Sequence, residues 1–179
     1  WFHTYGLPTI ITSCTNNYGP HQFPEKLIPL MTLRAMRGQT LPIHGTGENI
    51  RDWIYVDDHV QGLLAALRWG VPGERYGFGG GEELSNLQLV QTLCRTLDAR
   101  APRFDGAPHC ESIRFVTDRP GHDFRYAMDS SKASRELGWA PNTPLIEGLE
   151  KTITYYLQAQ TQLMSPTYKG ERLGLRAAG

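Results

Sequence analysis

Residues 7–20 read LPTIITSCTNNYGP and join an apolar segment to a polar one. Apolar and β-branched residues occupy both odd and even positions of residues 7–14, which predicts a strand covered on both faces. Residues 15–20 are rich in Asn, Gly and Pro, which favour a turn. Because ligands of α/β proteins bind beyond the carboxyl ends of strands, this loop is a candidate binding site, and a plain turn is an equal alternative.

Strands and helices alternate along the rest of the chain. Further strands are expected over residues 41–45, 52–56, 75–81 and 112–117. Helices are expected over residues 24–36, 57–67, 85–97, 130–138 and 143–157, and the fourth should end at Gly138. The apolar face of the second is formed by Val60, Leu63, Leu64 and Leu67, and that of the third by Val90, Leu93, Cys94 and Leu97. In the last, the residues expected to face inward are Ile146, Leu149, Ile153, Tyr156 and Leu157. This alternation predicts an α/β fold.

Composition narrows the class of protein. The 179 residues carry 18 Lys and Arg against 18 Asp and Glu, with 40% hydrophobic residues, which is typical of a globular protein and not of a disordered one. The neutral charge gives no reason to expect nucleic acid as a partner. No segment approaches the roughly 20 apolar residues of a membrane span, so no membrane partner is expected either.

The cysteines and the first residues bear on the origin of the chain. Cys14, Cys94 and Cys110 are widely spaced, which predicts reduced, buried thiols in a cytoplasmic protein. Residues 1–8 have no features of a signal peptide and are typical of the last turn of a helix that ends at Gly6. Since the chain does not begin with Met, we expect it to be part of a longer protein.

Two segments carry candidate anion ligands. Arg51 opens the sequence RDWIYVDD, where a guanidinium could bind a diphosphate through two hydrogen bonds, although a surface arginine is the more frequent outcome. Asp57 and Asp58 are expected to cap the following helix. In DRPGH, residues 118–122, Arg119 and His122 could converge on a phosphate, or an Asp–Arg pair could simply hold the loop.

Other motifs are absent or misleading. Gly77–Gly81 lacks the glycine spacing of a dinucleotide loop and is followed by two glutamates, so we interpret it as a strand end and turn. The six histidines show no metal-ligand spacing, and no metal is expected. No tyrosine is followed by a lysine four residues later, and no catalytic residue is predicted.

Four motifs together carry a family resemblance. TNNYGP at 15–20, FPEKLIP at 23–29, RDWIYVDD at 51–58 and DRPGH at 118–122 resemble the nucleotide-sugar branch of the extended short-chain dehydrogenases. Within that branch they are most similar to the dTDP-glucose 4,6-dehydratase family. The likeness covers residues 5–157, and the second and fourth motifs are the most specific to that family.

The resemblance implies an α/β fold made of the last strands of a Rossmann-type sheet and a smaller sugar-nucleotide-binding domain. Residues 1–159 would be the carboxyl-terminal, substrate-binding portion, and residues 160–179 a loose tail. The glycine-rich NAD loop, the Tyr-x-x-x-Lys pair and the Asp–Glu pair of the family lie upstream of this portion.

The resemblance also implies an activity for the full-length protein. Such a lyase oxidises C4 of dTDP-glucose with NAD, eliminates water across C5 and C6, and returns the hydride to C6. The product, dTDP-4-keto-6-deoxyglucose, feeds rhamnose and other deoxysugars. The full-length enzyme would be a homodimer, and the 179-residue chain alone would be inactive. Alternatives are part of another nucleotide-sugar epimerase or decarboxylase, or a non-catalytic sugar-nucleotide-binding fragment.

Site residues follow from the same resemblance. Asn17 would contact the nicotinamide end of NAD. Substrate contacts would come from Asn16, from Lys26 and Leu27 along the sugar nucleotide, from Pro42, Ile43 and His44 at the base, from Arg51 and Asn86 at the diphosphate, and from Asp118, Arg119, Pro120, Gly121 and His122 on the far side. The family usually has Tyr where His44 stands, so base specificity is not implied. It usually has Asn where Gly77 stands, a departure that we interpret as structural.

Overall fold

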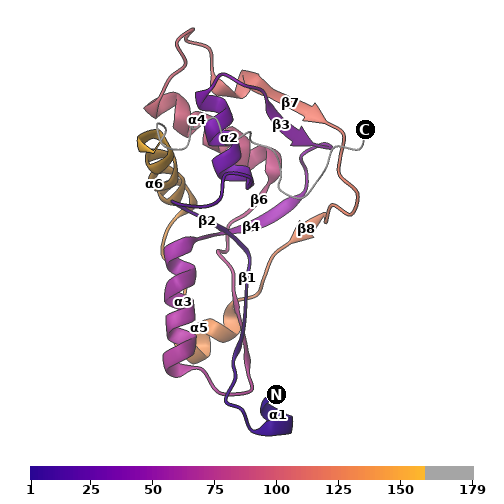
Figure 1. Cartoon of the computed structure of the whole chain (residues 1–179), viewed down its shortest axis with the longest axis vertical. Coiled ribbons are helices and arrows are strands. Elements are labelled where there is room, and N and C mark those ends of the chain that lie inside the picture. Colours follow the sequence, from indigo (N-terminus) through magenta and orange to yellow (C-terminus); the bar gives the residue numbers. More distant parts are fainter. Residues whose placement is uncertain (160–179) are drawn as a thin grey trace. The chain divides into compact units, whose positions relative to one another are not determined.

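The structure, a computed structural model, describes residues 1–159 (Figure 1). Its helices and strands are α1 (Phe2–Tyr5), β1 (Ile11–Cys14), β2 (Asn16–Tyr18), α2 (Leu27–Met36), β3 (Leu41–His44), β4 (Ile50–Tyr55), α3 (Val56–Trp69), β5 (Arg75–Phe78), β6 (Glu83–Ser85), α4 (Asn86–Arg100), the 3₁₀ helix η1 (His109–Ser112), β7 (Ile113–Val116), β8 (Arg125–Tyr126), α5 (Ser131–Leu137) and α6 (Leu145–Gln158). The fold is α/β with parallel strand pairs, as predicted. The predicted loose tail, residues 160–179, lies outside the described residues.

The chain forms two compact units. Unit 1 contains Trp1–Gly19, Glu48–Asn86 and Pro120–Gly148, and unit 2 contains Pro20–Gly47, Leu87–Arg119 and the described residues from Leu149 onward. Each unit therefore draws on stretches that are far apart in the sequence.

Two sheets belong to unit 1. In one, β1 runs parallel to β5, with Ile11 opposite Arg75. In the other, β4 pairs with β2 and β8 in parallel and with β6 antiparallel. The turn predicted at residues 15–20 was therefore wrong in part, because Asn16–Tyr18 is a strand. Its backbone pairs with β4, and this long-range contact overrides the local preference of Asn for turns.

The first strand is less covered than its sequence predicts. β1 begins at Ile11, and that side chain is 47% exposed. Among residues 1–159, β5 is the one strand that pairs with β1. Residues 1–159 therefore do not themselves provide the expected coverage on both faces.

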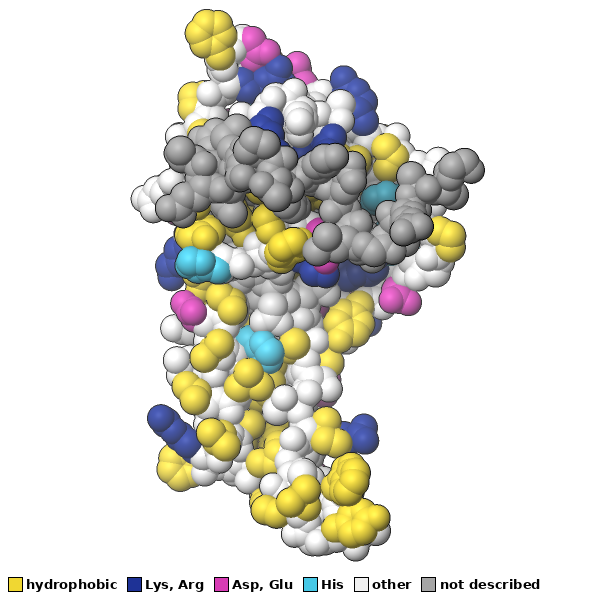
Figure 2. All heavy atoms as spheres, in the orientation of Figure 1, with side chains coloured by type: hydrophobic (Ala, Val, Ile, Leu, Met, Phe, Trp, Pro, Cys, Tyr) yellow, Lys and Arg dark blue, Asp and Glu magenta, His cyan; other side chains and the backbone are white. Residues whose placement is uncertain are grey.

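Helix α3 turns its small residues inward, whereas the apolar face expected from the sequence is exposed in the described part of the chain. Gly62 and Ala66 are buried, and a Cβ on Gly62 would lie 2.7 Å from the Phe78 ring. Close packing of the helix on β5 therefore uses the face without large side chains. The bulky apolar residues, which we call the α3 stripe, are exposed: Val60 (43%), Leu63 (38%), Leu64 (36%) and Leu67 (80%). Hydrophobic side chains gather over this helix in Figure 2.

The two aspartates at the start of α3 are not its N-cap. Tyr55 occupies that position, without a side-chain capping bond. The buried Asp58 carboxylate instead accepts a hydrogen bond from the Thr143 backbone N–H at 2.9 Å, and its backbone oxygen accepts one from Trp139 Nε1 at 2.9 Å. Asp58 therefore ties α3 to the segment between α5 and α6.

The core of unit 1 lies between α3, α5 and β5. Its buried cluster consists of Ile54, Ala66, Tyr76, Phe78, Ala133, Leu137 and Trp139. Helix α5 ends at Gly138, which has a φ of 64°, as the predicted glycine stop requires.

The glycine-rich segment is a turn held by Asp52. The buried carboxylate accepts hydrogen bonds from the backbone N–H groups of Gly80 (3.1 Å) and Glu82 (3.0 Å). A Cβ on Gly80 would lie 1.7 Å from the Trp53 carbonyl oxygen. Glycine is therefore needed here for close approach to β4, which confirms the interpretation as a strand end and turn.

Unit 2 combines one parallel strand pair with helices. β3 pairs with β7, with Leu41 opposite Ile113. The predicted buried face of α4 is confirmed for Val90, Leu93, Cys94 and Leu97. Helix α2 begins at Leu27, three residues after the predicted start at Pro24.

Two smaller expectations need correction. Ile146 of α6, predicted to face inward, is 51% exposed. All three cysteines are free, but only Cys94 is buried, whereas Cys14 is half-buried and Cys110 is exposed.

None of the helices within residues 1–159 combines the length and apolar character that a bilayer crossing requires.

Candidate functional site

The residues predicted from the family resemblance divide between the two units, and each group is described within its own unit. Unit 1 carries Asn16, Asn17, Arg51, Asn86, Pro120, Gly121 and His122, and unit 2 carries Lys26, Leu27, Pro42, Ile43, His44, Asp118 and Arg119.

Asn17 lies on β2, just beyond the carboxyl end of β1, and its side chain is held at both ends. Its Nδ2 donates to Cys14 Sγ at 3.1 Å and to the Thr15 carbonyl oxygen at 3.1 Å. Its Oδ1 lies 2.9 Å from Nδ1 of His59. The preceding Asn16 is half-buried and lies opposite Trp53 in the β2–β4 pair. An amide fixed in this way offers a defined donor and acceptor pattern to a ligand.

Arg51 is buried, unlike the surface arginine that was the alternative. Its side chain is on β4, and the residue is 7% exposed. The guanidinium donates to the backbone oxygens of Ile50 and Asp123, each at 2.7 Å. A guanidinium is always charged, so β4 carries a positive charge whose position is fixed by backbone carbonyls.

The last three residues of the DRPGH motif, 120–122, belong to unit 1. Pro120 and Gly121 form an exposed turn, with Gly121 at a φ of 66°, and His122 is half-buried. The next residue, Asp123, accepts hydrogen bonds at its backbone oxygen from both Arg51 and Asn49.

A backbone hydrogen bond holds Asn86 next to the start of β4. Its backbone N–H donates to the Asn49 oxygen at 3.0 Å. Within unit 1, the structure therefore gathers Arg51, Asn86 and the residues after His122 at the start of β4.

Unit 2 gathers a second group at the ends of β3 and β7. His44 Nδ1 lies 3.1 Å from the Thr117 oxygen. A Cβ on Gly45 would lie 2.9 Å from Asp118 Oδ2, so Asp118 lies against the turn that follows β3. The Asp118 carboxylate accepts the Arg119 backbone N–H at 2.8 Å.

The remaining unit 2 residues differ in exposure. Ile43 is 1% exposed, whereas Pro42 is half-buried. Lys26 is the N-cap of α2, immediately before Leu27, and its exposed ammonium lies 3.0 Å from Glu25 Oε1.

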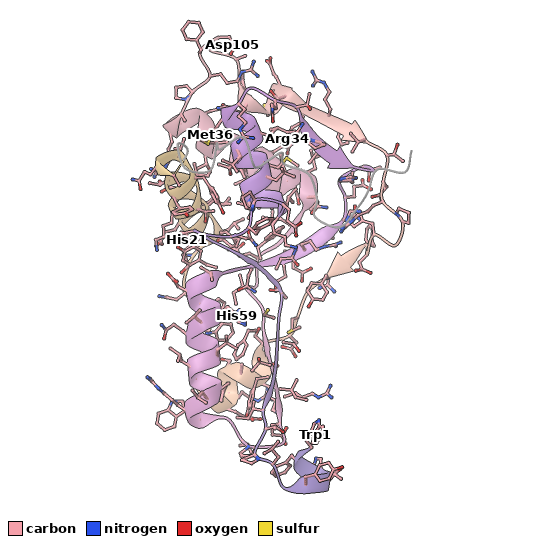
Figure 3. All side chains as sticks on the ribbon, viewed as in Figure 1. Trp1, His21, Arg34, Met36, His59 and Asp105 are labelled. Atoms are coloured by element: carbon pink, nitrogen blue, oxygen red, sulfur yellow. The ribbon has the colours of Figure 1, made fainter. Side chains whose placement is uncertain are left out.

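His59 is the contact to Asn17 that the sequence did not reveal. It lies 42 residues from Asn17, in the first turn of α3, where Figure 3 shows its ring pointing from the helix towards the strands. Burial lowers the pKa of His59, which favours a neutral ring. The contact depends on the pairing of β2 with β4, since His59 follows the carboxyl end of β4. Among residues 1–159, no group of three or more His, Cys, Asp and Glu side chains is arranged to hold a metal ion.

Comparison with known proteins extends these observations. The family model described as GDP-mannose 4,6 dehydratase matches residues 1–152. A dTDP-glucose 4,6-dehydratase of Escherichia coli is 52% identical over 98% of this chain, which corresponds to 50% of that protein. The chain thus spans about half the length of the curated relatives it matches.

Solved structures show the same pattern. A dTDP-glucose 4,6-dehydratase of Streptomyces venezuelae, described with NAD and TYD bound, is 43% identical with a TM-score of 0.82, over 90% of this chain and 47% of that one. A UDP-glucose 4-epimerase of Thermotoga maritima, described with UDP-glucose, is 31% identical with a TM-score of 0.77, over 89% of this chain and 49% of that one. The chain therefore has the fold of about half of each of these α/β enzymes.

Proposed function

Because the chain belongs to the family described as GDP-mannose 4,6 dehydratase, we propose that it is the substrate-binding half of an NAD-dependent dTDP-glucose 4,6-dehydratase. The observation that carries this proposal is the 52% identity to the Escherichia coli dehydratase over nearly the whole chain. The complete protein is a cytoplasmic, homodimeric lyase that makes dTDP-4-keto-6-deoxyglucose, and the 179-residue chain alone is inactive.

In this proposal, Arg51 binds the diphosphate of the nucleotide sugar. Its planar guanidinium suits two-point binding of phosphate oxygens, and the backbone carbonyls of Ile50 and Asp123 hold it in place. The other substrate contacts come from Asn16, Lys26, Leu27, Pro42, Ile43, His44, Asn86, Asp118, Arg119, Pro120, Gly121 and His122.

The chemistry of Asn17 fits one end of NAD. The nicotinamide carries a carboxamide with a donor NH₂ group. The Asn17 NH₂ donates to Cys14 Sγ and the Thr15 oxygen, but its Oδ1 can accept a second hydrogen bond beside the one from His59 and so suits that NH₂ group. Its place beyond the carboxyl end of a parallel strand suits a ligand of an α/β sheet. When bound, NAD supplies the hydride acceptor and donor for the reaction, and Asn17 contributes binding and orientation.

Identity favours a dehydratase over an epimerase. The dehydratase structure from Streptomyces venezuelae shares 43% of its aligned residues with this chain, and the Thermotoga maritima epimerase shares 31%. Both cover nearly the same part of the chain, so the difference does not come from coverage.

The test joins this chain to the part of the Escherichia coli relative that lies outside the alignment, which gives a full-length "joined protein". We expect it to convert dTDP-glucose to a product that has lost one water, measured by liquid chromatography and mass spectrometry. UDP-glucose and UDP-glucuronate serve as competing substrates, and the 179-residue chain alone is the inactive control.

Three outcomes would contradict the proposal. Epimerised UDP-glucose, with no dehydration, would make the protein an epimerase. Loss of carbon dioxide from UDP-glucuronate would make it a decarboxylase. Binding of dTDP-glucose without any turnover, while the Escherichia coli protein is active in the same assay, would leave a non-catalytic binding fragment.

A further inference from the structure

Three side chains of unit 1 form a continuous hydrogen-bonded chain. Asn17 Nδ2 donates to Cys14 Sγ at 3.1 Å, and Asn17 Oδ1 lies 2.9 Å from His59 Nδ1. Because an amide oxygen only accepts hydrogen bonds, His59 Nδ1 carries the proton and donates it. One end of the amide is therefore fixed by β1, and the other by the first turn of α3.

The surroundings of His59 support this arrangement. The residue is half-buried, and its ring centroid lies 5.9 Å from that of Phe78 on β5. Burial lowers the pKa of His59, so the ring is neutral at neutral pH. A neutral imidazole carries its proton on one nitrogen only, and the bond to Asn17 selects Nδ1.

We propose that His59 is a positioning residue, which holds the Asn17 amide in the one orientation that receives the carboxamide of the cofactor. The inference rests on the proposed function for the identity of that ligand. A side-chain amide can rotate by half a turn and exchange its donor with its acceptor. Cys14 Sγ and the Thr15 carbonyl oxygen hold the NH₂ end of Asn17, and His59 holds the oxygen end. Without the His59 donor, the oxygen end would be less firmly held, and binding would have to immobilise it. Fixing the amide in advance removes that cost.

Two substitutions separate the hydrogen bond from the bulk of the ring. In His59→Asn, the side-chain NH₂ takes nearly the place of Nδ1 and can still donate to Asn17. In His59→Gln, the NH₂ takes nearly the place of Nε2 and cannot reach Asn17 in the same way. The exposed His3, which lies in the same unit, provides a control as His3→Gln.

The first measurement uses nuclear magnetic resonance on the 179-residue chain. We expect long-range ¹H–¹⁵N correlations to show the proton of His59 on Nδ1. The Asn17 side-chain NH₂ signals should shift and exchange faster with water in His59→Gln, and return towards the wild type in His59→Asn. A structural role of His59 alone would not distinguish these two variants.

The second measurement is the dissociation constant for NAD of the joined protein, by calorimetry. In His59→Gln, loss of the hydrogen bond that holds Asn17 should raise the dissociation constant for NAD about five- to tenfold. His59→Asn should restore tight binding, and His3→Gln should leave it unchanged. Unchanged Asn17 signals and NAD affinity in His59→Gln, or equal losses in both His59 variants, would overturn the inference. A joined protein that binds NAD but does not dehydrate dTDP-glucose would overturn the proposed function and leave the role of His59 intact.

Discussion

The charged side chain of Arg51 is buried, and burial of a charge costs free energy unless the charge is paired or hydrogen-bonded. The guanidinium is bound to the backbone oxygens of Ile50 and Asp123. In the joined protein, Arg51→Ala should weaken binding of dTDP-glucose by about 1.5–3 kcal/mol, as expected for a lost charge-assisted hydrogen bond. Calorimetric titration measures this difference.

Two further variants keep the Arg51 experiment interpretable. Arg51→Lys retains the charge without the planar fork, so its affinity should lie between those of the wild type and Arg51→Ala. Arg68→Ala removes an exposed arginine of α3 and should have no effect. Unchanged affinity in Arg51→Ala, with a normal thermal melt, would remove Arg51 from the diphosphate site.

The cysteines differ in reactivity because they differ in burial. Burial raises the pKa of Cys94 from 9.0 to about 12, whereas Cys110 is exposed on η1. Since the thiolate is the nucleophile, iodoacetamide at pH 8 should label Cys110 within minutes and Cys94 only after denaturation, as followed by peptide mass spectrometry. Rapid labelling of Cys94 in the native protein would contradict this, and Cys110→Ser provides the control.

The same shift has a defined effect on stability. The folded state holds the Cys94 proton more tightly than the unfolded state does. The contribution of the Cys94 proton to the free energy of unfolding is therefore complete below pH 9.0 and is lost as the pH rises towards about 12.

At the level of elements, the sequence predicts best what local contacts determine. The apolar repeat of α4 and the glycine after α5 are features of single helices, and both are confirmed. β2 was missed because its strand character comes from pairing with β4, which lies more than 30 residues further along the chain. The link between His59 and Asn17 was missed for the same reason.

The orientation of α3 could not be predicted from its periodicity. The helix has one face with the small residues Gly62 and Ala66, which are buried together with Asp58, and another with large apolar residues at Leu63 and Leu67. Hydrophobicity favours burial of the large face. The structure buries the small face because it permits the closer approach to Phe78.

The α3 stripe leads to a prediction about association. Exposed contiguous apolar side chains favour contacts with other molecules. We expect the 179-residue chain to self-associate through this stripe, and the double variant Leu63→Glu and Leu67→Glu to shift it towards monomer in sedimentation velocity. Ile146→Glu, at an exposed apolar residue outside the stripe, should leave association unchanged. A double variant that associates like the wild type would exclude the stripe as the interface.

On the scale of the whole molecule, the two units are interleaved in sequence. Unit 1 requires Trp1–Gly19, Glu48–Asn86 and Pro120–Gly148 together. Its contacts span long separations: the Tyr18 hydroxyl donates to the Leu145 oxygen at 3.3 Å, 127 residues along the chain. A high share of such contacts slows folding, because loops must close before the contacts form.

This interleaving has a consequence during protein synthesis. Residues 1–19 leave the ribosome about 130 residues before Gly148 does, and at roughly 5–20 residues per second the delay is on the order of ten seconds. Strand β1 lacks its partner β5 until Phe78 has emerged, and the Tyr18 hydroxyl lacks its partner Leu145 for nearly the whole interval. We therefore expect the nascent chain to be held by chaperones that bind extended apolar segments until translation has supplied the last of them.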